Sequence, residues 1–300
     1  MHRIRLAAYN VTLWLVLVFA SPSHSATILS ENFDVSAVSG TSACWVSRPN
    51  AGGTENTTGC GNFAPISEPA YSTPRATMRL DTTGPAHSGA RSVYISYPKD
   101  EALAYAQHNL PAGTDHIFFT QWVYFDANFD FALGQKMGRI DIWDSINDVS
   151  LSSFIIVVYC ANCGSGLNDG IQNDMGGITF NKNGGENYGY ADGVVFTRGT
   201  WYKVEMEIKL NTPSSSNGEA RLWVNDSLVA SRTGMGGTDM RPSGGDTRSM
   251  SFLRIGGWDS NSSSDPYPSA MIYWTDDVCL DDAARCNASD LGVVFSSGFE

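Results

Sequence analysis

The sequence has little positive charge and almost no helical periodicity. It holds 19 Lys and Arg residues against 31 Asp and Glu residues, a formal net charge of −12. An acidic surface of this kind repels nucleic acid and anionic membranes, so neither is an expected partner. Beyond the first 25 residues the sequence also lacks a long apolar run, so we expect no membrane span in the remaining chain.

The first residues resemble an export signal. Basic residues lie in the first five positions, an apolar run covers residues 11–20, and small residues surround position 25. This order is typical of a signal peptide, and the apolar run is too short for a membrane anchor. We therefore expect a signal peptide at 1–25, a single domain at 26–285, a tail at 286–300, and a secreted protein, either extracellular or periplasmic. Removing the two basic residues of 1–25 leaves 17 against 31, a net charge of −14.

Six cysteines in an exported chain indicate disulfides. Sequence alone allows several pairings, and the short-range choice is Cys44–Cys60, Cys160–Cys163 and Cys279–Cys286. Residues 160–163 also have the spacing of a redox motif. The Asn and Gly residues around them favour a loop and a structural bridge, because a redox pair needs a strand followed by a helix.

Strand patterns recur along the chain, separated by loops rich in turn-forming residues. Segment 117–125 is apolar on both faces, which is typical of a central strand in stacked sheets. Segment 201–210 places its even-numbered, apolar side chains on one face. We predict an all-β, antiparallel sandwich of two sheets with strands at 117–125, 138–143, 152–159, 201–210, 220–224, 252–256 and 271–280.

Two carboxylate patterns raise the alternative of a retaining glycoside hydrolase. The sandwich glucanases carry a Glu-x-Asp-x-x-Glu strand, and residues 139–144 place Arg139 at its nucleophile position. Glu205 and Glu207 share a strand face, but Lys203 and Lys209 flank them there. We interpret this second pattern as a salt-bridged strand surface rather than a catalytic pair.

Three sequence blocks resemble the concanavalin A-like sandwiches, and among these the family 14 and family 20 polysaccharide lyases. The first block is Gly-Thr-Trp-Tyr-Lys-Val-Glu at 199–205, followed by 209–213, 217–218 and 222–226. The second covers 129–131 and Gly-Gln-Lys-Met-Gly at 134–138, and the third is 272–278. The resemblance implies a jelly-roll fold and a secreted lyase acting on alginate, glucuronan or a related uronate-containing glycan.

Such a lyase needs a group that neutralises the uronate carboxylate, a base and an acid. By resemblance, Lys136 matches the functional lysine of the family's turn, and Arg139 has the planar fork of a carboxylate clamp. Tyr188 and Tyr190, two residues apart, would share one face and supply a phenol for proton transfer. Gln121 would contact substrate from a central strand.

Other readings of these residues stay open. Lys136 fits a solvated turn lysine, and Arg139 fits a partner of Asp141 or Asp144. Tyr188 and Tyr190 fit loop packing or stacking on sugar. The strand at 152–159 is nearly all apolar where the family has polar groups. Further substrate contacts are expected from Trp143, Tyr159 and Trp258.

Related sandwiches hold a structural calcium ion between their first and last strands. Glu31 and Asp277 resemble those positions, and Asp276 is an alternative to Asp277. Calcium takes six to eight oxygen ligands, so backbone carbonyls would supply the rest. The other interpretation is a pair of surface acids. No organic cofactor is expected.

Three classes of function remain open. The first is a polysaccharide lyase working by β-elimination, and the second is a non-catalytic carbohydrate-binding sandwich that stacks sugars on Trp143, Tyr188, Tyr190 and Trp258. The third is an extracellular adhesion or interaction protein. A fold does not decide among them. We expect polysaccharide as the partner and a monomer.

Overall fold

The computed structural model describes most of the chain between residues 27 and 286. The described residues are 27–31, 46–49, 77–97, 104–129, 131, 135–144, 149–160, 176–182, 186–191, 194, 196–236, 239–243, 245–257 and 271–286. The signal segment, Cys44, Cys60, Cys163 and Trp258 lie outside these ranges, as does the tail beyond residue 286. Predictions for them stay predictions.

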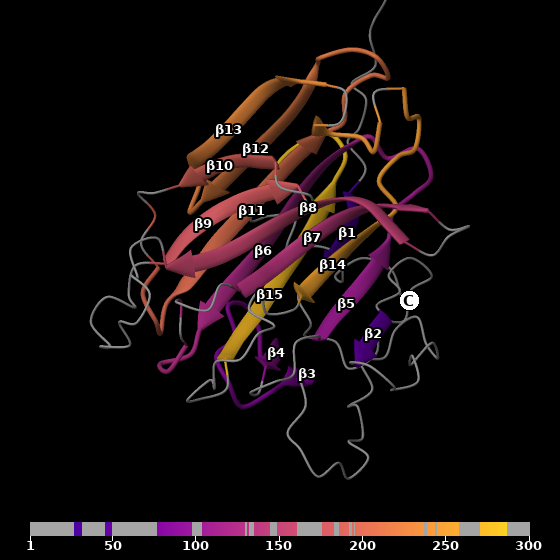
Figure 1. Cartoon of the computed structure of the whole chain (residues 1–300). Helices are drawn as coiled ribbons and strands as arrows, with labels where there is room; N and C mark the ends of the chain where they lie inside the picture. The colour runs from indigo at the N-terminus through magenta and orange to yellow at the C-terminus, as the bar shows by residue number, and fades with distance from the viewer. Residues whose placement is uncertain are drawn as a thin grey trace, which may run out of the picture.

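Two antiparallel sheets form the fold (Figure 1). Sheet A has the order β13 (Ser227–Met235), β12 (Gly218–Val224), β11 (Trp201–Lys209), β6 (His116–Phe125), β15 (Met271–Asp281), β4 (Ser92–Tyr97) and β3 (Thr77–Asp81), and β1 (Thr27–Glu31) also pairs with β15. Sheet B has the order β10 (Glu186–Ala191), β9 (Gly176–Lys182), β8 (Val149–Cys160), β7 (Gln135–Asp144), β14 (Phe252–Gly257), β5 (Ala104–Asn109) and β2 (Val46–Pro49).

The predicted jelly-roll sandwich is confirmed. Many sheet neighbours are distant in sequence, such as β6 beside β15 and β7 beside β14, and the described residues contain no α-helix. Every predicted strand is present, with small shifts at its ends. β7 begins at Gln135, three residues before the predicted start, so Lys136 lies in a strand and not in the predicted turn.

The core lies between the two sheets and follows the predicted alternation. In β6, Phe119 and Val123 are fully buried, and their partners on β11 are Met206 and Tyr202. Sheet B adds Ile140 and other apolar side chains to the same cluster. Alternation thus gives each strand one face toward the core and one away from it.

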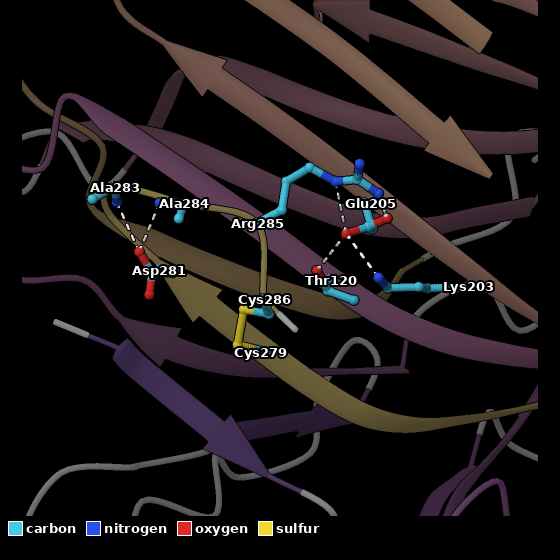
Figure 2. The surroundings of a disulfide bond; sticks show 9 residues. All are labelled: Thr120, Lys203, Glu205, Cys279, Asp281, Ala283, Ala284, Arg285 and Cys286. Atoms are coloured by element: carbon cyan, nitrogen blue, oxygen red, sulfur yellow. Dashed lines mark hydrogen bonds and ion pairs between the residues drawn. A yellow bond between two sulfur atoms is a disulfide. The ribbon is translucent and has the colours of Figure 1, made fainter. Parts of the chain in front are cut away.

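The outer face of sheet A, away from the core, carries the predicted charged row of β11. Glu205 is 2% exposed and forms ion pairs with Arg285 and with Lys203, whose Nζ lies 3.2 Å away (Figure 2). Glu207 pairs with Arg221 at 2.5 Å and with His116 at 2.9 Å. Burial opposes the ionisation of Glu207, but these partners outweigh it and lower its pKa. The prediction of a salt-bridged surface is confirmed.

A disulfide between Cys279 and Cys286 confirms one of the three predicted pairs. It joins β15 to the turn that follows, and both cysteines are buried. The bridge lies beside the Arg285–Glu205 ion pair, as Figure 2 shows. Arg285 also lies over the ring of Trp223, 4.8 Å from its centroid. The covalent closure therefore holds a charged side chain against sheet A.

Replacing Cys279 and Cys286 together with alanine should lower the free energy of unfolding by about 2 kcal/mol, because the closed loop is short. Urea denaturation of the oxidised wild type and of the variant would measure the difference. The Arg285→Ala variant, which keeps the bridge, is the matched control. Equal stability of the double variant and the wild type would contradict the structural role.

His108 on β5 is a buried titratable group in the fold. It is 4% exposed, and burial lowers its pKa from 6.5 to about 4. His108 is therefore protonated at a lower pH in the folded state than in the unfolded chain. Stability is complete above pH 6.5 and is lost as the pH falls from 6.5 toward 4.

His108→Leu should remove up to about 3 kcal/mol of this acid sensitivity. The measurement is the difference in unfolding free energy between variant and wild type at several pH values between 7 and 4. Carboxylates titrate in both proteins alike and cancel in this difference. The difference should therefore change with pH only through His108, which the variant lacks. A difference that is constant with pH would show that His108 does not titrate as described.

Candidate active site

The outer face of sheet B, the face away from the core, carries a cluster of charged side chains. Ile140 and Ile142 of β7 face the core, so Arg139 and Asp141 alternate to the outer face. On the neighbouring β14, Arg254 is the direct partner of Arg139. Both arginines therefore lie on one face of two adjacent strands.

Asp141 binds both arginines. Its Oδ1 accepts from Nε of Arg139 at 2.7 Å, and Nη2 of Arg139 lies equally close. Nη1 of Arg254 lies 3.5 Å from Oδ2. Asp141 is fully buried, and the two arginines are 7% and 6% exposed. This confirms the pairing of Arg139 with Asp141 that the sequence left open.

A ring stacking contact supports the second arginine. The guanidinium of Arg254 lies over Phe252, its neighbour but one on β14, 4.4 Å from the ring centroid. Such a contact attracts the cation and restricts its orientation. Two guanidinium groups with fixed directions are suited to recognising carboxylates, because the planar fork binds them with two parallel hydrogen bonds.

Most other predicted site residues lie on strands of sheet B. Lys136 pairs with Val157, and Trp143 pairs with Ser150. Tyr159 pairs with Gly177, and Tyr190 pairs with Thr179. Their side chains, like that of Tyr188, lie outside the described part of the structure. The backbone thus brings the predicted lysine and tyrosine to the same sheet as Arg139.

The structure corrects one prediction about this set and removes the basis of another. Gln121 is fully buried on the core face of β6, where Thr275 Oγ1 donates to its Oε1 at 3.4 Å, so it cannot contact substrate. The prediction that Tyr188 and Tyr190 share one face assumes unbroken alternation, which does not hold in β10. The register of β10 shifts between Asn187 and Gly189, and Tyr188 is the extra residue.

Arg254 is the member of the charged cluster that sequence reasoning missed. Segment 252–256 was recognised as a strand, and its alternation places Phe252 and Arg254 together. The missing information was its neighbour, because sequence does not show that β14 pairs with β7. An arginine between apolar residues on a predicted strand is the signal that the sequence offers.

Asp277, one of the two predicted calcium ligands, is bound by side chains of the protein itself. Asp277 Oδ2 lies 2.5 Å from His87 Nδ1, and its Oδ1 accepts from Ser88 Oγ at 2.6 Å. Within the described ranges no group of three or more His, Cys, Asp or Glu could hold a metal ion. The backbone of Glu31 lies opposite Val278. The calcium ion stays a prediction, and nothing below depends on it.

Asp276 beside it is a buried acid. Its Oδ2 accepts from the backbone N–H groups of His87 and Ser88, at 2.8 and 3.2 Å. Burial and the neighbouring charge of Asp277 nevertheless raise the pKa of Asp276 to about 8. These groups lie on sheet A, on the opposite side of the molecule's core from Arg139.

Part of the chain matches a known protein family. Residues 172–268 match the family model described as polysaccharide lyase 14. This match confirms the resemblance to that family. A search of curated proteins by sequence finds no match. In the described residues no helix is long and apolar enough to cross a membrane.

Similar solved structures include an alginate lyase of family 14 from Aplysia kurodai, with 16% identity and a TM-score of 0.47, covering 68% of this chain and 86% of that chain. An alginate lyase from a Chlorella virus has 16% identity and a TM-score of 0.48, covering 68% and 89%. A glucuronan lyase from the fungus Trichoderma reesei has 13% identity and a TM-score of 0.45, covering 68% and 86%. These likenesses assign no residue or activity to this chain.

Replacing Asp141 with asparagine should lower the free energy of unfolding by about 3 kcal/mol, because it leaves buried guanidinium groups without their carboxylate. Chemical denaturation at neutral pH would measure the loss. The control is Asp226→Asn, because Asp226 likewise pairs with an arginine, Arg285, but its side chain is 70% exposed. This control substitution should lower the free energy of unfolding by less than about 1 kcal/mol. Equal effects of the two substitutions would contradict the buried cluster.

Proposed function

We propose that this protein is an exported polysaccharide lyase that cleaves a uronate-containing glycan by β-elimination. The observation that carries the proposal is the arginine pair on the outer face of sheet B, held by the fully buried Asp141. The match to polysaccharide lyase 14 supports the reaction class. The start of the sequence and the Cys279–Cys286 bridge support export, because disulfides persist in oxidising compartments.

The chemistry explains why cations matter in such a site. A base removes the proton at C5 of the uronate, the bond from C4 to the linking oxygen breaks, and a C4–C5 double bond forms. The leaving oxygen takes up a proton. Negative charge develops on the carboxylate as the C5 proton leaves, so a fixed guanidinium group beside that carboxylate lowers the barrier.

The candidate residues fall into two groups, one for carboxylate recognition and one for proton transfer. Arg139 and Arg254 are the candidates for carboxylate recognition, because their forks are held in place by Asp141 and, for Arg254, by Phe252. Lys136 and Tyr190 are the candidates for proton transfer at C5 and at the leaving oxygen. A tyrosine phenol and a lysine amine both carry out such transfers when positioned within hydrogen-bonding reach.

A second candidate function is carbohydrate binding without cleavage, and one observation on sheet A favours it. Tyr94, Trp274, Tyr124 and Trp201 are successive cross-strand partners in one row on its outer face. Neighbouring rings in the row are 5.4–5.7 Å apart. Trp274 is 8% exposed, and the other three rings are half-buried. Aromatic side chains with a free edge or face are suited to stacking on sugars.

The test is to incubate the wild-type protein with alginate, glucuronan and neutral glycans and to follow the ultraviolet absorbance of unsaturated uronate products. We expect absorbance to rise with at least one polyuronate and with no neutral glycan. Binding without any rise would favour the second candidate. Absence of both binding and cleavage would contradict both.

Arg254→Ala should lower kcat/KM on the active polyuronate about 100-fold, the size of effect expected for losing one donor to developing charge. Arg254→Lys should recover only part of this, because the ammonium group lacks the planar fork. The matched control is Arg285→Ala, which removes an arginine from the outer face of sheet A. Undiminished activity in a folded Arg254→Ala variant would remove Arg254 from the site.

A further inference from the structure

Two of the β-bulges in the described part of sheet B each lie beside a glycine. In β7, Lys136 is opposite Val157 and Gly138 is opposite Ile156, so Met137 is an extra residue. In β10, Asn187 is opposite Asn181 and Gly189 is opposite Phe180, so Tyr188 is an extra residue. A bulge inserts one residue into a strand and reverses the faces of the residues beyond it.

Both bulges adjoin the same cross-strand row. Gly138 and Gly189 belong to one row, in which Ile156 and Phe180 lie between them. Ile156 is fully buried in the core, so this row faces the core. The next row along the strands therefore belongs to the outer face, and its positions are Lys136, Val157, Thr179 and Tyr190.

Without the bulges, neither end of that outer row would be in place. In a regular β7, position 136 would alternate with Gly138 and Ile140, which belong to the core face. In a regular β10, position 190 would take the face opposite to position 187, and Asn187 belongs to the outer face through Asn181 and Ile155. Each bulge therefore transfers one of the two positions to the outer face.

The bulge in β7 is packed tightly against sheet A. Met137 is fully buried. A Cβ atom added to Gly138 would lie 2.7 Å from Cε1 of Phe119, closer than carbon atoms approach in proteins. The absence of a side chain at 138 is what allows the bulged strand to lie this close to the core. The core thus fixes the position of the bulge.

We infer that the paired bulges are a positioning device, which sets Lys136 and Tyr190 in one row on the face that carries Arg139. In this assignment Met137 and Tyr188 are positioning residues, and Tyr188 contributes as a spacer, not as a phenol. The two intervening strands put the ends of the row about 14 Å apart, so the two residues approach a glycan from opposite sides. The catalytic consequence rests on the proposed lyase function, whereas the placement rests on strand pairing alone.

Thiol labelling tests the placement without any reference to activity. The variants Lys136→Cys and Ile140→Cys are each treated with a small thiol reagent in the folded state, with the wild type as background. Positions 136 and 140 have the same parity, so a regular strand would protect both. We expect the Lys136→Cys variant to be labelled and the Ile140→Cys variant to stay protected. Equal protection of both would overturn the placement.

Deletion tests the catalytic consequence. Removing Met137 should lower kcat about 100-fold, as displacement of a catalytic group does, while Met137→Leu keeps the residue count and should keep kcat. Tyr188→Phe should likewise retain activity, and Tyr190→Phe should lose it. Loss of activity in Tyr188→Phe, with Tyr190→Phe unaffected, would overturn the spacer role even if the deletion variant fails to fold.

The two tests separate the inference from the proposed function. If the wild type cleaves no polyuronate while labelling distinguishes positions 136 and 140, the lyase proposal fails and the placement stands. If the wild type is active but labelling does not distinguish them, the placement fails and the lyase proposal stands.

Discussion

The packing of two sheets against one another is the constraint on which the rest of this structure depends. Side chains alternate along every strand, so burying one face in the common core decides which residues are left for the other. In β6 the buried set includes Phe119 and Val123, and in β7 it includes Ile140. Arg139 lies on the outer face of sheet B because the side chain of its neighbour Ile140 is buried in the core.

The charged residues of the two outer faces are accommodated differently. On sheet A, Glu205 pairs with Lys203 of its own strand and with Arg285 of the turn after β15, and Glu207 pairs with Arg221 of β12. On sheet B, one carboxylate serves two guanidinium groups. Burying an ion without a partner is costly. Each arrangement therefore includes a partner that is distant in sequence, Arg285 on sheet A and Arg254 on sheet B. In a strongly acidic chain, a face with two arginines around one acid is distinctive.

Much of the fold could be predicted from sequence because its strongest signal is local. The apolar character of segment 117–125 predicted a central strand, alternation in segment 201–210 predicted a strand and its buried face, and close cysteine spacing predicted the Cys279–Cys286 pair. The candidate site was less predictable because it depends on pairing between distant strands. Arg254 could not be placed beside Arg139 until β14 was known to adjoin β7. The sequence predicts a substrate contact for Gln121, but the alternation of its own strand places this side chain in the core.

Bulges are the second limit on sequence reasoning. A rule of strict alternation gives Tyr188 and Tyr190 one face, and it gives position 136 the face of Ile140. One extra residue in each strand breaks this alternation, so position 136 takes the face opposite to Ile140 and position 190 takes the face of Asn187. Nothing in the local composition marks the extra residue, apart from the glycine that follows it.

The row formed by Lys136, Val157, Thr179 and Tyr190 also has a direction. Cross-strand rows run at right angles to the strands, along the hydrogen bonds of the sheet. A glycan that touched both ends of this row would therefore lie across β7, β8, β9 and β10 and not along any one of them. Successive sugars would then meet successive strands, so the register between strands, more than the sequence of any single strand, would set which sugar lies over which side chain.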